Sequence, residues 1–255
     1  LAAPSRMEQA KAYLKARYYR VHNLVHENKF RAENTATILF SSGSTAEPKG
    51  VQLSQHNLQS NIESFRAVLS PRRDDVILGT LPYFHSFGYT ATFWFPLLSG
   101  LSIASHHNPL EGESIGQLAR QYRASILLTT PTFLMAYCRK VPADAFQSLR
   151  YAFTGAEKLQ TRVSDLFAKK FGLKPYEGYG ATELSPVCAL SMPNVNVDSV
   201  DETGHREGRL GRPLPGITIR IVHPETLKPL APGEEGLIQV KGPNVMQGYL
   251  NQPSV

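Results

Sequence analysis

The sequence has few cysteines and no long apolar run. Two of its 255 residues are cysteines, Cys138 and Cys188, and they stand far apart without the spacing of a metal site. This scarcity argues against a disulfide scaffold or a zinc module and favours a reducing compartment. The longest apolar stretch, Tyr89 to Ala104, is interrupted by Pro96 and Gly100. It is too short to cross a bilayer, so the sequence predicts no transmembrane span.

A dense block of basic residues is also lacking. The chain has 27 Lys and Arg against 21 Asp and Glu, a net charge of +6. This excess suits anionic small ligands, acidic protein partners or an anionic membrane surface, and it predicts no nucleic-acid partner. Residues 1–33 read as an amphipathic helical leader or linker. The first 20 residues carry five Lys and Arg and no apolar core, so they predict no secretory signal and a cytoplasmic location.

Apolar runs and amphipathic patterns alternate through residues 34–205. This alternation predicts an α/β fold in which helices flank both faces of a mostly parallel sheet. Ligands of such sheets bind beyond the carboxyl ends of the strands. The expected strands lie at 38–40, 76–78, 101–104, 125–129 and 151–153, and the expected helices at 55–69, 93–98, 114–122, 131–139 and 162–171.

The composition changes after about Pro193. Ile217 to Ile221 alternates with period two, and Leu237 to Val240 follows a Pro-Gly turn. Residues 206–255 are therefore expected to begin a small antiparallel β subdomain.

A hydroxyl-rich loop follows the first apolar run. It reads Ser41-Ser42-Gly43-Ser44-Thr45-Ala46-Glu47-Pro48-Lys49-Gly50. Short donors, glycines and one lysine suit a polyphosphate. The standard P-loop places its lysine after the second glycine, whereas Lys49 precedes Gly50, so that motif is not met. A flexible surface linker is the alternative from these residues alone.

Further landmarks follow this loop in a fixed order. They are Leu81-Pro82-Tyr83-Phe84-His85-Ser86, Thr154-Gly155-Ala156-Glu157, Tyr176-Glu177-Gly178-Tyr179-Gly180-Ala181-Thr182-Glu183 and Gly242-Pro243-Asn244-Val245-Met246-Gln247-Gly248-Tyr249. Together with the loop they resemble the AMP-forming adenylating enzymes, the family of acyl-CoA synthetases, luciferases and adenylation domains. The resemblance spans residues 34–251 and implies part of the large domain of that family.

Within the family the landmarks look closest to the acyl carrier protein synthetases of bacterial lysophospholipid acylation. The resemblance implies ATP-dependent activation of a fatty acid to an acyl-adenylate with release of pyrophosphate, then transfer to a thiol of acyl carrier protein or CoA. Association with the inner face of the membrane would come through fused regions.

Three alternatives remain open from the sequence. They are a long-chain fatty acid–CoA ligase, a non-catalytic nucleotide-binding module, and a phosphoryl transferase. The order Lys49-Gly50 counts against the last. An acyltransferase commonly uses a His-x-x-x-x-Asp arrangement, which the sequence does not contain.

The resemblance also implies roles for individual residues. His85 would line the acyl-carboxylate pocket, Thr182 would bond the α-phosphate, and Glu183 would bind Mg²⁺, an ion that takes oxygen ligands. Tyr179 would stack on adenine. The predicted ATP-binding residues are Ser41, Ser42, Gly43, Ser44, Thr45, Lys49, Gly155, Ala156, Glu157, Glu177, Gly178, Tyr179, Gly180, Ala181 and Thr182.

Two expectations concern the limits of the site. The run Phe93, Trp94, Phe95, Leu97 and Leu98 reads as ordinary core or as the lining of an acyl tunnel. The family's small carboxy-terminal domain, which supplies a catalytic lysine, has no match in these 255 residues. The fragment alone is therefore expected to bind ATP weakly and to adenylate poorly or not at all.

Overall fold

The computed structural model describes residues 31–41, 47–197 and 200–252, with residues 5, 7, 8, 10 and 11 near the start. Clustering of contacts divides the chain into Leu1–Asn34 and Thr35–Val255. The fold described below is that of the second unit. The predicted amphipathic leader or linker of residues 1–33 lies largely outside the described residues, and the loop residues Ser42, Gly43, Ser44 and Thr45 lie wholly outside them.

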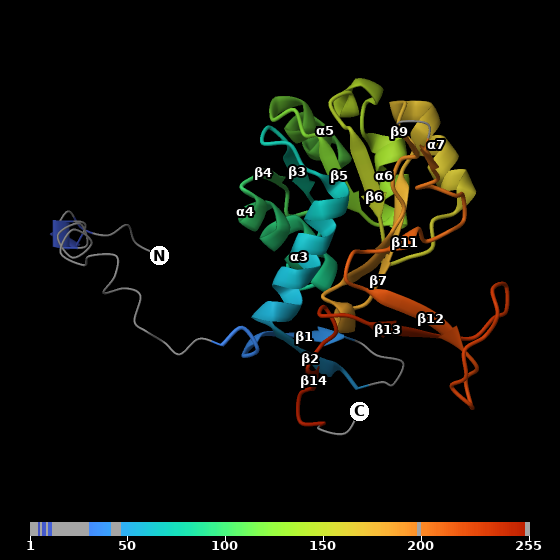
Figure 1. Ribbon diagram of the computed structural model, residues 1–255. Coiled ribbons are helices and arrows are strands. Elements are labelled where there is room, and N and C mark those ends of the chain that lie inside the picture. Colours follow the sequence, from blue (N-terminus) through green and yellow to red (C-terminus); the bar gives the residue numbers. More distant parts are fainter. Residues whose placement is uncertain are drawn as a thin grey trace. The chain divides into compact units, whose positions relative to one another are not determined.

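A seven-stranded sheet forms the centre of the second unit (Figure 1). Its strands run in the order β11-β8-β7-β6-β5-β3-β4, and neighbours from β7 to β4 are parallel. The predicted α/β fold with a mostly parallel sheet is therefore confirmed. The bounds are β3 (Val76–Gly79), β4 (Ser102–Ser105), β5 (Ile126–Thr129), β6 (Tyr151–Thr154), β7 (Tyr176–Gly180), β8 (Val187–Leu190) and β11 (Arg212–Pro213).

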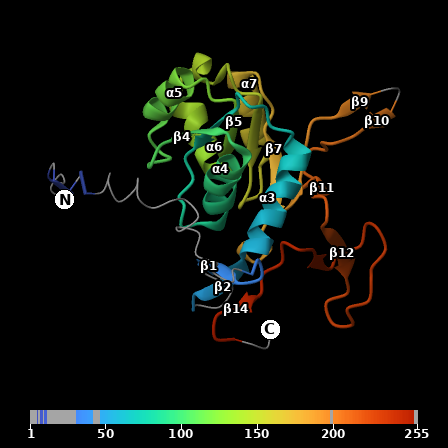
Figure 2. The ribbon, with the colours of Figure 1, turned by 60° about the vertical axis from the view of Figure 1, so that its left-hand side comes forward.

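Helices cover both faces of this sheet (Figures 1 and 2). Successive strand residues point to opposite faces, so Ile77 packs with α3 and α4 while Leu78 packs with α5, α6 and α7. All four residues of β5 are buried, as expected for a strand covered on both sides. The bounds are α3 (Gln55–Leu69), α4 (Phe95–Ser99), α5 (Gly112–Gln121), α6 (Pro131–Lys140) and α7 (Thr161–Phe171).

Local signals fix where the helices begin and end. Ser54 and Asn57 form a reciprocal capping box at the start of α3, and Thr130 caps α6. Gly172 ends α7 in the left-handed conformation that its sequence position predicts. A π-helical segment, η1 (Gly88–Trp94), leads into α4. No helix among the described residues combines the length and the apolar character needed to cross a membrane.

The expectation that residues 38–40 form a strand of the parallel sheet is wrong. These residues lie in β1 (Thr35–Ser41), which pairs antiparallel with β2 (Lys49–Ser54) in a separate sheet completed by β14 (Gly248–Tyr249). The connection from Ser41 to Lys49 is too short for a parallel crossover, which needs a dozen or more residues. The phosphate-loop candidate is therefore a hairpin connection, and Lys49 stands on its second strand.

The carboxy-terminal strands belong to three different sheets. β12 (Thr218–Val222) and β13 (Leu237–Lys241) form the expected antiparallel pair. β11 joins β8 in the central sheet, and β14 joins β2. A short pair of β9 (Val195–Val197) and β10 (Val200–Glu202) precedes them. The subdomain boundary at residue 206 stays a prediction.

Candidate active site

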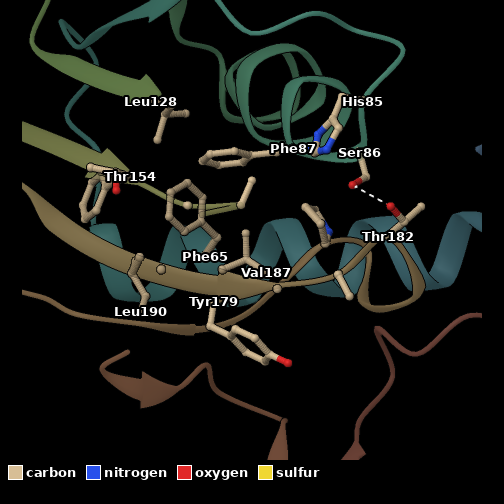
Figure 3. A pocket seen from close by; sticks show the side chains of 17 residues that line it. Phe65, His85, Ser86, Phe87, Leu128, Thr154, Tyr179, Thr182, Val187 and Leu190 are labelled. Carbon is tan, nitrogen blue, oxygen red and sulfur yellow. Dashed lines mark hydrogen bonds between the residues drawn. The ribbon is translucent and has the colours of Figure 1, made fainter. Parts of the chain in front are cut away.

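A pocket of about 190 Å³ lies beyond the carboxyl ends of β6 and β7 (Figure 3). Its walls come from the segments that follow β3, β6 and β7, and from α3, β5 and β8. The parallel arrangement brings these segments to one edge of the sheet, where ligands of such folds bind. The predicted residues that line it are His85, Gly155, Ala156, Gly178, Tyr179, Gly180, Ala181 and Thr182.

His85 stands at the polar end of the pocket. Its Nδ1 accepts a hydrogen bond from the Phe87 N–H at 3.2 Å, so in this arrangement the ring proton sits on Nε2. His85 is exposed as a whole residue, and partial desolvation of its ring lowers the pKa of the imidazole below its ordinary value. At neutral pH the side chain is therefore a neutral donor facing the pocket.

Replacing His85 by asparagine is expected to weaken the pH dependence of stability. Because the pKa of His85 is lower in the folded state, the unfolded chain is protonated at His85 before the folded chain as the pH falls. The contribution of neutral His85 to the free energy of unfolding is therefore fully present above about pH 6.5 and is lost as the pH falls through the folded-state pKa. Asparagine still offers an acceptor to the Phe87 N–H but does not titrate. Melting temperatures followed from neutral to mildly acidic pH should fall less steeply in the variant, and parallel curves would contradict this.

Thr182 and Ser86 meet across the pocket. Their hydroxyl oxygens are 3.1 Å apart, and Ser86 is almost fully buried. This contact joins the segment after β3 to η3 (Thr182–Leu184). Ser86 ends the landmark Leu81-Pro82-Tyr83-Phe84-His85-Ser86, but its contact with Thr182 was not predicted from the sequence. Thr154 also lines the pocket, and its Oγ1 is buried with no hydrogen-bond partner among the described residues.

Close backbone approach shapes the segment around Tyr179. A Cβ on Gly180 would lie 2.0 Å from the Pro186 carbonyl oxygen, so only glycine fits there. Ala156 adopts a left-handed conformation at the rim. Tyr179 is half-buried and lies on the opposite side of its strand from Phe65 (Figure 3). One strand therefore separates the tyrosine ring from the aromatic interior of the pocket.

Glu157 and Glu177 do not line the pocket. The buried Glu177 carboxylate accepts a hydrogen bond from the Leu159 N–H at 3.0 Å, which ties the segment after β6 to β7. Glu157 accepts one from the Thr132 hydroxyl at 2.6 Å on the outer side of α6. The geometry gives Glu177 a positioning function, while its predicted contact with nucleotide stays a prediction.

Glu183 is connected to the hairpin of β1 and β2 through Tyr249. The Tyr249 hydroxyl donates to Glu183 Oε1 at 2.8 Å, and the Lys49 ammonium lies 5.1 Å from the centre of the same ring. Burial, together with the nearby carboxylate, raises the pKa of Tyr249, which keeps it a donor. The predicted phosphate-binding lysine and the predicted metal-binding carboxylate thus both contact the side chain of Tyr249. The role of Tyr249 was not predicted from its sequence position.

Ser41 ends β1 opposite Lys49, and its Oγ is buried without a partner among the described residues. A buried hydroxyl of this kind needs a bonding partner. It sits at the base of the hairpin whose remaining predicted phosphate ligands are the undescribed residues 42–45.

This fold, with a pocket at the carboxyl edge of a parallel sheet and glycine-rich backbone at its rim, is typical of α/β proteins that bind a small ligand at this edge. The profile of the AMP-binding enzymes matches residues 3–250, and the chain belongs to that family. It is 36% identical over 225 residues to a Probable 4-coumarate–CoA ligase 3 of Dictyostelium discoideum, covering 86% of this chain and 39% of the relative. Identity to a Long-chain-fatty-acid–CoA ligase of Bacillus subtilis is 29%, covering 86% and 38%.

Solved structures agree with this assignment. ATP-bound MatB from Rhodopseudomonas palustris superposes with a TM-score of 0.74 at 30% identity, covering 88% of this chain and 42% of that one. The apo form of the same protein gives a TM-score of 0.77 at 28% identity. The chain thus spans about two fifths of the length of these relatives.

Proposed function

We propose that this chain forms the nucleotide- and acid-binding part of an AMP-forming acid–thiol ligase. A carboxylate oxygen attacks the α-phosphorus of ATP, and the bond to the leaving pyrophosphate breaks. A thiol sulfur then attacks the acyl carbon and AMP leaves. The observation that carries the proposal is that His85, Thr182 and the strand segment that carries Tyr179 line one pocket in a chain of the AMP-binding enzyme family.

The chain's own residues have distinct tasks in this proposal. Tyr179 holds the adenine, and the Thr182 hydroxyl, already held by Ser86, bonds the α-phosphate. His85 presents its Nε2–H to the acid. Lys49 offsets the charge of the departing phosphates, since nucleophile and leaving group are both anionic. These groups position reactants and charge, which is most of what a phosphorus-centred displacement requires.

The Glu183 carboxylate suits magnesium. No group of three His, Cys, Asp or Glu side chains in the described part of the chain could hold a metal by itself. Magnesium in nucleotide sites takes one or two protein carboxylates and completes its shell with phosphate oxygens and water. Tyr249 orients this carboxylate from one side. When bound, the ion would neutralise phosphate charge.

The relatives differ in the acids that their names specify. The names of two relatives above specify 4-coumarate and a long-chain fatty acid. Both name CoA as the thiol. Acyl carrier protein as acceptor, and a place in lysophospholipid acylation, stay predictions from the sequence resemblance.

Tyr179→Ala tests the nucleotide site. Base–aromatic stacking contributes about 1–3 kcal/mol, so affinity for AMP and for Mg²⁺-ATP should fall roughly 5- to 150-fold by isothermal titration. Tyr179→Phe keeps the ring and should bind within about twofold of the original. Equal binding by all three proteins would place the nucleotide elsewhere.

If the chain consumes ATP in the presence of acids, we expect the products to be AMP and pyrophosphate, and formation of ADP would contradict the proposal.

A further inference from the structure

Residues 242–249, one of the sequence landmarks, lie against η3, the turn that carries the predicted phosphate and metal contacts. The Asn244 side chain donates a hydrogen bond to the Leu184 carbonyl at 2.8 Å, and the Asn244 carbonyl accepts one from the Ser185 hydroxyl at 2.8 Å. Asn244 is 1% exposed and Ser185 is fully buried, so water does not compete for these bonds. The backbone of the turn is therefore held by a segment 60 residues further along the chain.

The same segment is anchored to the amino end of α3. The Asn57 side-chain nitrogen donates to the carbonyls of Pro243 and Val245, at 2.7 and 2.8 Å. The Asn57 side-chain oxygen accepts from Ser54 in the capping box, so both ends of this amide have partners. Residues 242–249 therefore connect the turn to a helix that is itself packed in the core.

Tyr249 contacts a side chain of the turn rather than its backbone. Its hydroxyl donates to Glu183 Oε1 at 2.8 Å, whereas Glu183 Oε2 has no hydrogen-bond partner in the part of the chain that the structure describes. Tyr249 lies on β14, which pairs with β2, so the sheet fixes the position of the tyrosine (Figure 1). One carboxylate oxygen is therefore held, and the other is available to a cation.

This arrangement matches the outer layer of a metal site. Carboxylates that bind a metal are usually hydrogen-bonded themselves, and these outer partners orient the ligand. Building on the proposed function, we propose that residues 242–249 position the metal-binding side chain of the nucleotide site. Asn244 fixes the turn, and Tyr249 holds the Glu183 carboxylate so that its second oxygen can bind the cation of Mg²⁺-ATP. The sequence resemblance implied no role for this landmark.

Tyr249→Phe removes the hydroxyl and keeps the ring, including its contact with Lys49. The quantity to measure is the metal ratio, which is the ATP affinity of the 255-residue chain in excess Mg²⁺ divided by its ATP affinity in EDTA, both by isothermal titration. Loss of an outer partner of a metal ligand costs about 10- to 100-fold in metal affinity, so we expect the metal ratio to fall at least about tenfold. AMP, and ATP in EDTA, should bind as they do to the original chain.

Tyr137→Phe is the matched control. Tyr137 is fully buried in α6, and its hydroxyl donates to Thr80 at 3.0 Å in the core cluster on the other face of the sheet. This substitution removes the same atom and one internal hydrogen bond at a distance from Glu183. Its metal ratio should equal that of the original chain, and melting temperatures establish that both variants fold.

Glu183→Gln shows whether the Tyr249 hydroxyl acts through the carboxylate. The amide oxygen can still accept from Tyr249, but magnesium in nucleotide sites takes carboxylates, so the metal ratio should fall in this variant alone. Adding Tyr249→Phe should then lower the metal ratio no further, because no metal-binding carboxylate is left to orient. A second fall as large as the one in Tyr249→Phe alone would show independent effects and overturn the proposal.

Asn244→Ala tests the hold on the backbone of the turn. It leaves the buried Leu184 carbonyl without its side-chain donor, and an unpaired buried group favours a rearrangement that restores a partner. Because the turn also carries the Thr182 hydroxyl, we expect AMP affinity to fall about tenfold, the usual effect of losing one hydrogen bond to a charged group. Adenosine, which has no phosphate, should bind as before. Unchanged AMP affinity in a folded variant would overturn the role of Asn244, and the Tyr249 comparison decides the role of the hydroxyl by itself.

Failure of this inference can be told from failure of the proposed function. If AMP and ATP bind and Tyr249→Phe leaves the metal ratio unchanged, the positioning role is overturned and the ligase proposal stands. If Tyr249→Phe weakens ATP equally with Mg²⁺ and with EDTA, the hydroxyl does not act through the metal ligand, and the inference is again overturned. If neither AMP nor ATP binds to the original chain, the proposed function is overturned, and this inference with it.

Discussion

Arg150→Ala is expected to lower the free energy of unfolding by about 3–5 kcal/mol, the usual cost of removing one partner of a buried ion pair. The guanidinium contacts both oxygens of Asp75, at 3.2 and 2.9 Å, and the Asp75 side chain is only 2% exposed. The Ser125 hydroxyl and the Arg72 N–H also donate hydrogen bonds to the Asp75 carboxylate. Without Arg150, a buried carboxylate would keep its desolvation cost and lose its counter-charge.

The same group of contacts sets the amino ends of β3, β5 and β6. Burial alone would raise the pKa of Asp75, but hydrogen bonds from Ser125, the Arg72 N–H and Arg150 outweigh it, so the pKa is lowered. A lowered carboxyl pKa contributes stability above the unfolded-state value, and this contribution is lost as the pH falls through the folded-state pKa.

Urea unfolding at neutral pH measures the effect of Arg150→Ala. The double variant Asp75→Asn with Arg150→Met serves as control, because replacing both charges should cost clearly less than removing one. If the single variant lost less than about 1 kcal/mol, as exposed pairs do, this account of the pair would be wrong.

Gly180→Ala is expected to disable the nucleotide site. The added methyl would lie 2.0 Å from the Pro186 carbonyl oxygen and close to Val187, so the turn between β7 and β8 must move. Overpacking of this kind costs about 1–3 kcal/mol of stability. Because the displaced backbone carries Tyr179 and Thr182, we expect AMP affinity to fall at least tenfold.

Gly172→Ala is the control that separates a loss of stability from a loss of AMP affinity. Gly172 ends α7 with φ +72°, and a Cβ there meets no atom within 4 Å. Its left-handed backbone gives alanine a cost of about 1–2 kcal/mol without touching the pocket. Titration of both variants with AMP should show a loss for Gly180→Ala alone. Comparable affinities in the two would mean that the Gly180 backbone does not shape the site.

Much of the fold could be predicted because its signals are local. The helices at 55–69, 131–139 and 162–171 combine an apolar stripe with residues that cap or begin a helix, and each lies within about two residues of its predicted bounds. The apolar run at 38–40 was correctly predicted as a strand but assigned to the wrong sheet. The pattern of these residues indicates an extended strand but does not indicate which other strand pairs with it.

The site could be predicted in part for the same reason. The motif residues His85, Tyr179 and Thr182 converge because strand order brings their loops to one edge. Contacts between single residues far apart in sequence could not be predicted. The Tyr249–Glu183 hydrogen bond spans 66 residues and the Asp75–Arg150 pair spans 75, and neither has a periodic pattern that indicates it.

The central claim is that the segment carrying Tyr179 and Thr182 holds a nucleotide beside the acid-binding pocket. The most direct measurement is a crystal structure of this chain with an N-acyl sulfamoyl adenosine, a stable mimic of an acyl-adenylate. The account predicts adenine against the Tyr179 ring, the sulfamoyl group beside the Thr182 hydroxyl, and the acyl group in the pocket that His85 and Phe87 line. Adenosine bound at another surface, or an acyl group outside this pocket, would contradict it.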